Sequence, residues 1–197
     1  SLQAKPTFAG PEMATVESIG EVAIDDTALE DNIEFEALRQ TVIEMSSERV
    51  GFDLEDAGFN GDDSSLTDAL YAQQDGYRVL ISSHTGTANS ATLDKSITKQ
   101  GWKLIPQQYR KRKADYRFYT ADDATIDFGD SYQNRIGDAA DVALRKGEEL
   151  TYVGIPVVGV PAYPNTLNTD QTELMCVRPK NLVLGIQREV RMETLRD

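Results

Sequence analysis

The sequence predicts an α+β fold, and three stretches indicate it. Apolar residues recur at three- and four-residue spacing from Ile33 to Ala57, which predicts one helix of about 37 Å. The stretch YVGIPVVGVPAYP, Tyr152 to Pro164, is almost wholly apolar and short enough for a strand. NLVLGIQREVRMET, residues 181–194, alternates apolar and polar side chains, as a half-buried strand does.

The first part of the chain supplies the long helix and little else that is regular. Residues 1–27 alternate in part and predict one or two strands. Asp31 or Asn32 can accept hydrogen bonds from the first helical turn, and Gly58 and Gly61 are expected to end the helix. Gly51, inside the helix, costs about 1 kcal/mol of stability relative to alanine.

The second part predicts shorter elements in alternation. Residues 93–108 form a helical pattern that Gly101 and Pro106 are expected to end. The other expected elements are a strand at YRVLIS (77–82), a strand at RFYT (117–120), a turn at 121–123, a helix at 126–141 and a strand-like run at ELMCV (173–177).

Three prolines interrupt the apolar stretch: Pro156, Pro161 and Pro164. Proline donates no hydrogen bond to a strand ladder, so we expect this strand at the edge of a sheet or at a bulge.

Charge is distributed unevenly along the chain. The 197 residues carry a net charge of −13. Residues 1–75 contain 18 acidic and 3 basic residues, a net charge of −15, whereas residues 76–197 contain 15 acidic and 17 basic residues, a net charge of +2. This polarity serves solubility, and it also suits head-to-tail packing of identical subunits. It disfavours non-specific binding to nucleic acid, and no apolar run is long enough to span a membrane.

Residues for catalysis or metal binding are few. Cys176 is the one cysteine and lies in an apolar run, so we interpret it as a buried structural thiol. His84 is the one histidine, and its neighbours Ser82 and Ser83 are too close in sequence to form a triad with it. FNGDDSSLTD, residues 59–68, is interpreted as a polar turn because it lacks the order of an EF-hand calcium loop. The sequence therefore predicts no catalytic residue, no cofactor and no metal site.

A dense basic run, QQYRKRKADYR, is the remaining candidate for recognition. It contains Arg110, Lys111, Arg112 and Lys113, with Tyr109, Tyr116, Phe118 and Tyr119 around them. Interleaved aromatic and basic residues can bind single-stranded nucleic acid. The patch is small in a chain of this net charge, so an inter-subunit salt-bridge strip or a solvated surface is the preferred interpretation.

The order of these segments resembles the major capsid proteins of tailed bacteriophages, which have the Johnson fold first described for the Hong Kong ninety-seven phage head. The segments that carry the resemblance are TYVGIPVVGVPAYP (151–164), PKNLVLGIQREVRMET (179–194), EVAIDDTALEDN (21–32) before the long helix, DKSITKQGWKLIPQQYRKRKADYRFYTADD (94–123) and RIGDAAD (135–141). Each of these has only a loose consensus, and their order and spacing carry the specificity.

The resemblance implies a capsid-type fold with a long spine helix and a mixed or antiparallel sheet in an axial domain. Residues 1–27 would be a remnant of the extended E-loop, residues 28–75 the spine helix and loop of a peripheral domain, and residues 76–197 the axial-type domain. The N-terminal arm, the ascending half of the E-loop and a final strand are not found, so the chain is expected to be a trimmed core.

The function that the resemblance implies is structural. Many copies would assemble as pentamers and hexamers into an icosahedral shell that encloses phage DNA, with scaffolding protein a candidate further partner. The location would be the phage head, assembled in the bacterial cytoplasm. We expect inter-subunit contacts at Glu44, Glu48 and Glu55 on the long helix and at Arg110, Lys111, Arg112 and Lys113.

Two alternatives stay open at this point. One is the shell protein of an encapsulin-like bacterial compartment, which the resemblance implies has the same fold. The other is an enzyme or ligand-binding protein, which a deep pocket with two or more convergent titratable groups would indicate.

Overall fold

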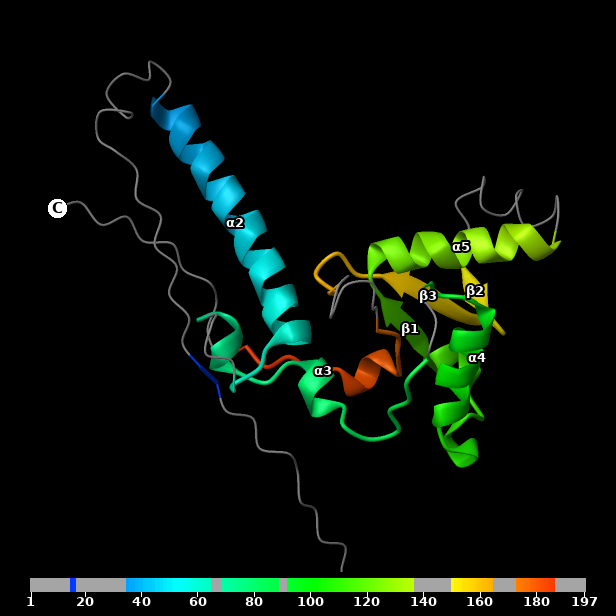
Figure 1. The fold of residues 1–197 in the computed structure, drawn as a ribbon. Coiled ribbons are helices and arrows are strands. Elements are labelled where there is room, and N and C mark those ends of the chain that lie inside the picture. Colours follow the sequence, from blue (N-terminus) through cyan, green and yellow to red (C-terminus); the bar gives the residue numbers. More distant parts are fainter. Residues whose placement is uncertain are drawn as a thin grey trace, which may run out of the picture. The chain divides into compact units, whose positions relative to one another are not determined.

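The computed structural model describes residues 15–16, 35–64, 69–88, 92–136, 150–164 and 173–186 (Figure 1). The chain divides into two compact units, one of Ser1–Ile43 with Leu184–Asp197 and one of Glu44–Val183. The elements described below belong to the second unit, apart from the first residues of the long helix, which begins at Phe35 in the first unit. The expected domain boundaries near residues 27 and 75 stay a prediction.

The long helix predicted from the apolar spacing is present as α2, Phe35–Asn60. It ends at Asn60, directly before Gly61, whose N–H donates to the carbonyl of Ala57 over 3.0 Å. Gly58 does not end it, because glycine lowers helix stability without preventing helical geometry. Among the described side chains of α2, Ala57 is buried, whereas Met45, Phe52 and Leu54 are exposed.

A four-stranded mixed sheet forms the centre of the unit and confirms the α+β prediction. Its strands are β1 (Arg117–Thr120), β2 (Thr151–Tyr152), β3 (Ile155–Gly159) and β4 (Met175–Val177), in the spatial order β2-β3-β1-β4. β1 and β3 are parallel, and the other two pairs are antiparallel. Phe118 lies opposite both Val157 and Cys176, which fixes which side chains share a face.

The proline-rich strand was expected at a sheet edge or at a bulge, and the structure shows that β3 is not an edge strand. β3 pairs with β2 on one side and β1 on the other. Pro156 is tolerated because the register with β1 begins at Val157, one residue later, so Pro156 is paired only with Thr151 of the short β2. Pro161 and Pro164 follow the end of β3.

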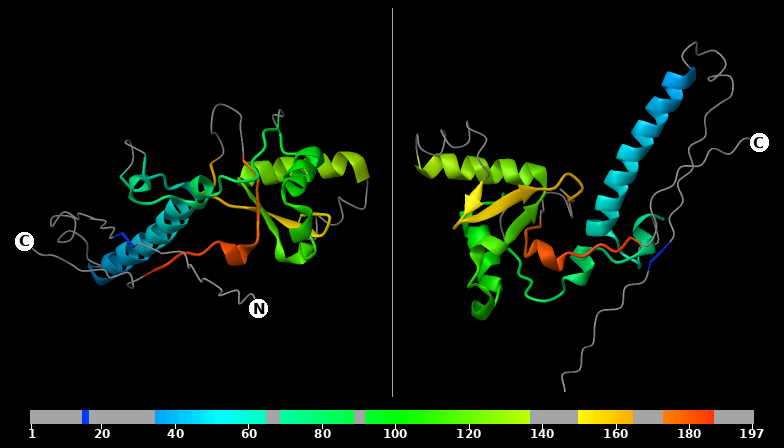
Figure 2. Two further views of the ribbon diagram at one scale, coloured as in Figure 1. Left: turned by 90° about the horizontal axis from the view of Figure 1, so that it is seen from below. Right: turned by 180° about the vertical axis from the view of Figure 1, so that it is seen from behind.

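Two helices cover one face of the sheet. α4, Lys95–Leu104, approaches β4, and Gly101 permits this because a Cβ there would lie 3.3 Å from Leu174. The Asp94 side chain caps α4 by accepting hydrogen bonds from the N–H groups of Ser96 and Ile97. α5, Asp122–Ile136, lies along β3 (Figure 2).

The start of α5 corrects the sequence prediction. The expected turn at 121–123 is the beginning of the helix, because Asp122 and Asp123 are favourable in a first helical turn. The predicted continuation to residue 141 lies outside the described residues.

The other face of the sheet meets the end of α2 and a short helix, α3 (Tyr77–Leu80). Phe59 of α2 contacts the rings of Tyr77, Tyr119 and Tyr163, at centroid distances of 5.6, 6.1 and 5.8 Å. The strand predicted at residues 77–82 is therefore wrong. A single helical turn directs Tyr77 to Phe59 and Arg78 to Glu173, which an alternating strand would place on opposite faces.

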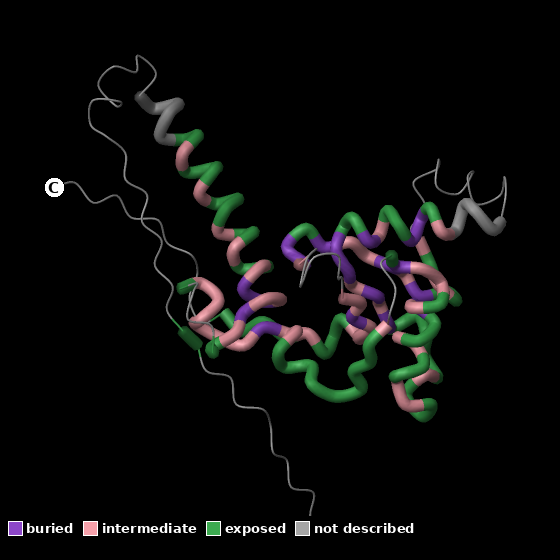
Figure 3. Tube along the Cα trace, in the orientation of Figure 1, coloured by how far each residue is buried: buried purple, intermediate pink, exposed green. Residues whose placement is uncertain are grey.

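The core lies between the sheet and its helices. Phe118, Phe128 and Ile155 are fully buried, and Leu93 is 1% exposed. Buried and exposed turns alternate along α5 in Figure 3, as expected for a helix with one face on a sheet. Short 3-10 turns complete the described chain: η1 (Tyr71–Gln73), η2 (Gln107–Tyr109), η3 (Lys113–Asp115) and η4 (Pro179–Asn181).

The strand predicted at residues 181–194 is not observed where the chain is described. Pro179–Asn181 forms η4, and residues 182–186 form no ladder. Leu182 has extended dihedral angles (φ −88°, ψ 103°), so alternation predicted the backbone conformation there but not a partner strand. Residues 187–194 lie outside the described residues.

Candidate inter-subunit surfaces

The basic run at residues 110–113, here called the basic loop, follows the end of α4. The Arg110 side chain points back to the end of α4. Its Nε donates to the carbonyl of Ile105, and its Nη2 donates to that of Lys103, each over 2.6 Å. These carbonyls end the helix and have no helical partner, so the guanidinium satisfies them and complements the negative helix end. Arg110 therefore positions the loop against α4.

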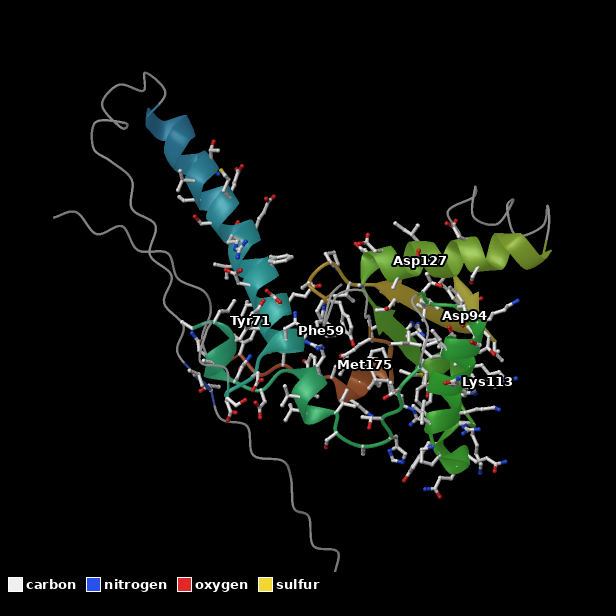
Figure 4. All side chains as sticks on the ribbon, in the orientation of Figure 1. Phe59, Tyr71, Asp94, Lys113, Asp127 and Met175 are labelled. Atoms are coloured by element: carbon white, nitrogen blue, oxygen red, sulfur yellow. The ribbon has the colours of Figure 1, made fainter. Side chains whose placement is uncertain are left out.

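The other three cations of the loop are exposed to solvent. Lys111, Arg112 and Lys113 have exposed side chains, and Figure 4 places Lys113 beside α4.

Tyr109 and Tyr116 fix the two ends of the basic loop. The carbonyl of Tyr109 accepts hydrogen bonds from the hydroxyl of Tyr116 (3.0 Å) and from Nη2 of Arg178 (3.2 Å). The Arg178 guanidinium lies 4.7 Å from the centre of the Tyr116 ring, which also contacts Trp102. The loop is thus presented on a packed support. Sequence reasoning did not find Arg178, which is 69 residues from Tyr109.

The burial of the neighbouring aromatic residues bears on the nucleic-acid alternative. Tyr116 and Phe118 are 6% and 0% exposed, so two of the four rings considered for base stacking are in the core. Tyr109 is 53% exposed and Tyr119 is half-buried. The stacking platform that the sequence pattern indicated is therefore not assembled at this loop.

The three predicted acidic contacts share one face of α2. Glu44, Glu48 and Glu55 are all exposed and are separated by four and seven residues, so they lie within about 40° of one another around the helix. The charge of this part of α2 is mixed, because Arg49 forms an ion pair with Asp53 (2.8 Å) and lies over the Phe52 ring.

The two residues considered for nucleophilic chemistry lie in unrelated places. His84 is exposed in the loop after α3, with a φ of 61°. Cys176 lies in β4 opposite Phe118 and is half-buried, not fully buried as predicted, and this burial raises the pKa of its thiol to about 12. A thiol with this pKa is protonated at neutral pH, which agrees with the interpretation of Cys176 as structural.

Three carboxylates converge in the turn after α2. Asp62, Asp63 and Asp75 have ligand oxygens within 4.8 Å of one another. Asp62 accepts hydrogen bonds from the hydroxyl and the N–H of Ser64, which lower its pKa, and Asp75 accepts one from the N–H of Asp63. These contacts stabilise the turn, and exposed acidic groups of this kind are common without a bound ion.

Comparison with known proteins finds a relative that matches almost the whole chain. No family model matches it. The chain is similar to a prophage capsid protein. This relative is named "Putative prophage capsid protein YqbE" and comes from Bacillus subtilis (strain 168). The two sequences are 32% identical over 198 residues, which is 98% of this chain and 63% of the length of the Bacillus protein.

Two features of this likeness matter for function. It covers both the long helix and the residues of the sheet, so it is not confined to a short motif. The name of the Bacillus protein describes a capsid component, which is a structural role.

Among the described helices, none is both long and apolar enough to cross a membrane.

Proposed function

We propose that this chain is a structural subunit of a phage head. The observation that carries the proposal is the similarity to the Bacillus prophage capsid protein along 98% of the chain. The order of the sequence segments, which resembles the Johnson fold, supports the same function. In this proposal α2 is the spine helix, and the sheet with α4 and α5 belongs to the axial domain.

The subunit would act by self-association and not by catalysis. Many copies assemble into pentamers and hexamers of an icosahedral shell, and each copy uses unlike surfaces against its neighbours. A scaffolding protein is a candidate partner during assembly in the bacterial cytoplasm. The net charge of −13 suits a shell that encloses DNA without adhering to it.

The exposed charges described above are the proposed inter-subunit contacts. Glu44, Glu48 and Glu55 form one, and Lys111, Arg112 and Lys113 form another, with Arg110 holding the basic loop in place. A row of like charges on a well-supported surface guides association and selects partners more than it adds affinity. The similarity to a prophage protein does not favour the alternative of a bacterial compartment.

The decisive experiment examines the protein expressed from its complete gene, together with the genes that flank it. Negative-stain electron microscopy and light scattering should detect closed shells or rings of five and six subunits. Replacing Arg112 and Lys113 by glutamate should impair assembly. A monomer that persists at high protein concentration would contradict the structural function, and normal particles from the double variant would contradict the role of the basic loop.

A further inference from the structure

The outer face of α5 is acidic around one exposed apolar residue. Ala124 and Phe128 face the core, whereas Ile126 is 64% exposed on the opposite side. Asp123 and Asp130 lie three residues before and four residues after Ile126, so they border it on the same helix face. Asp127 is exposed beside them and is marked on α5 in Figure 4. We call Asp123, Ile126, Asp127 and Asp130 the α5 surface.

A second surface combines positive charges with exposed apolar residues. Lys99 and Lys103 are exposed one turn apart on α4, about 100° and 140° around the helix from its buried Thr98. Arg110 joins the basic loop to this helix end, because it donates to the carbonyl of Lys103. Leu104 and Tyr109, 38% and 53% exposed, lie in the same part of the chain. We call Lys99, Lys103, Leu104, Tyr109 and residues 111–113 the α4 surface.

We propose that the α5 surface of one copy of this chain docks on the α4 surface of the next copy. The argument is complementarity of two kinds. Five cations would face three aspartates, and the exposed Ile126 would meet exposed Leu104 and Tyr109, which would give apolar contact beside the charged contacts. Tyrosine and arginine are the residue types that most often dominate such contacts.

The α5 surface is a better partner for the basic loop than the acidic face of α2. Residues 122–131 of α5 contain no basic residue, whereas α2 carries Arg49 between its glutamates. Like-charge contacts lower the stability of an interface, so the purely acidic helix is the more favourable partner.

The arrangement produces a chain of contacts and not a closed pair. α4 and α5 are different elements that run in different directions across the sheet (Figure 2). One copy can therefore present its α5 surface to one neighbour and its α4 surface to another. A heterologous contact of this kind closes into a ring when the rotation between copies allows it. The inference rests on the proposed function and specifies which surfaces meet within a ring.

A reciprocal charge exchange tests it in the protein expressed from its complete gene. The variant Lys99→Glu/Lys103→Glu and the variant Asp127→Lys/Asp130→Lys should each lower the yield of rings or shells about ten-fold or more, because like charges then face each other. Combining all four changes should restore the yield to within about three-fold of wild type. The substituted residues are exposed, so the unassembled subunit should stay folded in every variant. Its melting temperature should fall only slightly with Lys103→Glu, because Lys103 lies in the last turn of α4, where a negative charge is unfavourable.

The control exchange uses α2. Combining Lys99→Glu/Lys103→Glu with Glu48→Lys/Glu55→Lys should not restore assembly. Restoration by the α2 changes, or no restoration by the α5 changes, would overturn the inference while leaving the capsid function intact. A wild-type protein that forms neither rings nor shells would overturn the proposed function itself.

Should a reversed variant fail to fold, the neutral variants Lys99→Gln/Lys103→Gln and Asp127→Asn/Asp130→Asn replace it. The assembly yield of each neutral variant should depend less on salt concentration, between about 0.1 and 1 M, than the yield of the wild-type protein does. The reason is that salt screens the same charges that the variant has removed. An unchanged salt dependence in both neutral variants would contradict the pairing.

Discussion

The guanidinium of Arg78 holds the carboxylate of Glu173 through two hydrogen bonds. Nε donates to Oε2 over 2.7 Å, and Nη2 donates to Oε1 over 3.2 Å. The same guanidinium donates to the side-chain oxygen of Asn60 and lies 5.9 Å from the centre of the Tyr163 ring. Asn60 in turn donates to the carbonyl of Ala162. Arg78 thus connects α3, the end of α2, the turn after β3 and the residues before β4.

Replacing Arg78 by methionine should lower the free energy of unfolding by about 1–2 kcal/mol, measured by urea denaturation. The loss comes from charge-assisted hydrogen bonds, limited because the Glu173 side chain is 43% exposed. The matched control is Arg49→Met, whose side chain is 71% exposed in a pair within one helix and should cost less than about 0.5 kcal/mol. Equal losses in the two variants would contradict the role assigned to Arg78.

Gly61, directly after α2, and Gly76, directly before α3, should tolerate no side chain. The N–H of Gly76 donates to the carbonyl of Gly61 over 2.8 Å, and a Cβ on Gly61 would collide with the carbonyl oxygens of Gln74 and Ala57. A Cβ on Gly76 would lie 2.6 Å from backbone atoms of Gly61 and Phe59. Gly61→Ala and Gly76→Ala should therefore each lower stability by about 1–3 kcal/mol or more, because backbone must move to make room.

The control for this pair is Gly51, inside α2. A Cβ on Gly51 would meet nothing within 4 Å. Gly51→Ala should raise stability by about 0.5–1 kcal/mol, the usual gain for alanine in a helix interior. Thermal denaturation followed by circular dichroism measures all three variants. A stabilising effect at Gly61 or Gly76 would show that the close approach is absent.

Local patterns predicted the elements whose signal lies within a few residues. Three- and four-residue spacing gave α2 to within three residues at each end, and RFYT and ELMCV lie at β1 and β4. The same reasoning failed at residues 77–82 and 182–186, where apolar residues suggested strands. Strand formation depends on a partner, and the partner is not encoded locally. In α3 the contacts of Tyr77 and Arg78 with distant residues decide the outcome.

The sequence showed where the charged residues lie, but not which of their side chains are exposed on the surface. The basic run is visible in the sequence, yet nothing in it shows that Arg110 is used within the chain while Lys111 to Lys113 are exposed. That difference arises because Arg110 reaches the carbonyls at the end of α4. The α5 surface was also missed, because Asp123 was placed in a predicted turn while Asp127 and Asp130 were placed in a separate predicted helix.

The hairpin between β2 and β3 contains a strained residue. Val153 and Gly154 form its two-residue turn, with φ values of 54° and 81°. A turn with both values positive suits Asn-Gly, whereas a β-branched residue at positive φ is unfavourable. Val153→Asn should raise the free energy of unfolding by about 1 kcal/mol, because Val153 is 51% exposed and little packing is lost.

The control for the hairpin keeps the branched side chain. Val153→Thr should change stability by less than about 0.5 kcal/mol, because threonine has the same steric conflict at positive φ. Chemical denaturation of the two variants side by side separates backbone strain from polarity. Equal stabilisation by asparagine and threonine would mean that removing an exposed apolar side chain, and not relief of strain, causes the gain.

Cys176 should make stability depend on alkaline pH. Burial raises the pKa of its thiol from 9.0 to about 12, so the folded protein holds the proton more tightly than the unfolded chain. The stabilising effect is complete below pH 9 and is lost as the pH rises towards 12, by up to about 1.4 kcal/mol per pH unit. Cys176→Ala removes this contribution, so its free energy of unfolding should fall less steeply between pH 9 and 10.5. Burial also raises the pKa values of Tyr77 and Tyr163. The wild-type protein and Cys176→Ala both retain these tyrosines, so the difference between their curves of unfolding free energy against pH reports the thiol. Parallel curves, or rapid alkylation of the folded wild-type protein at pH 8, would show that the thiol is accessible and ionises normally.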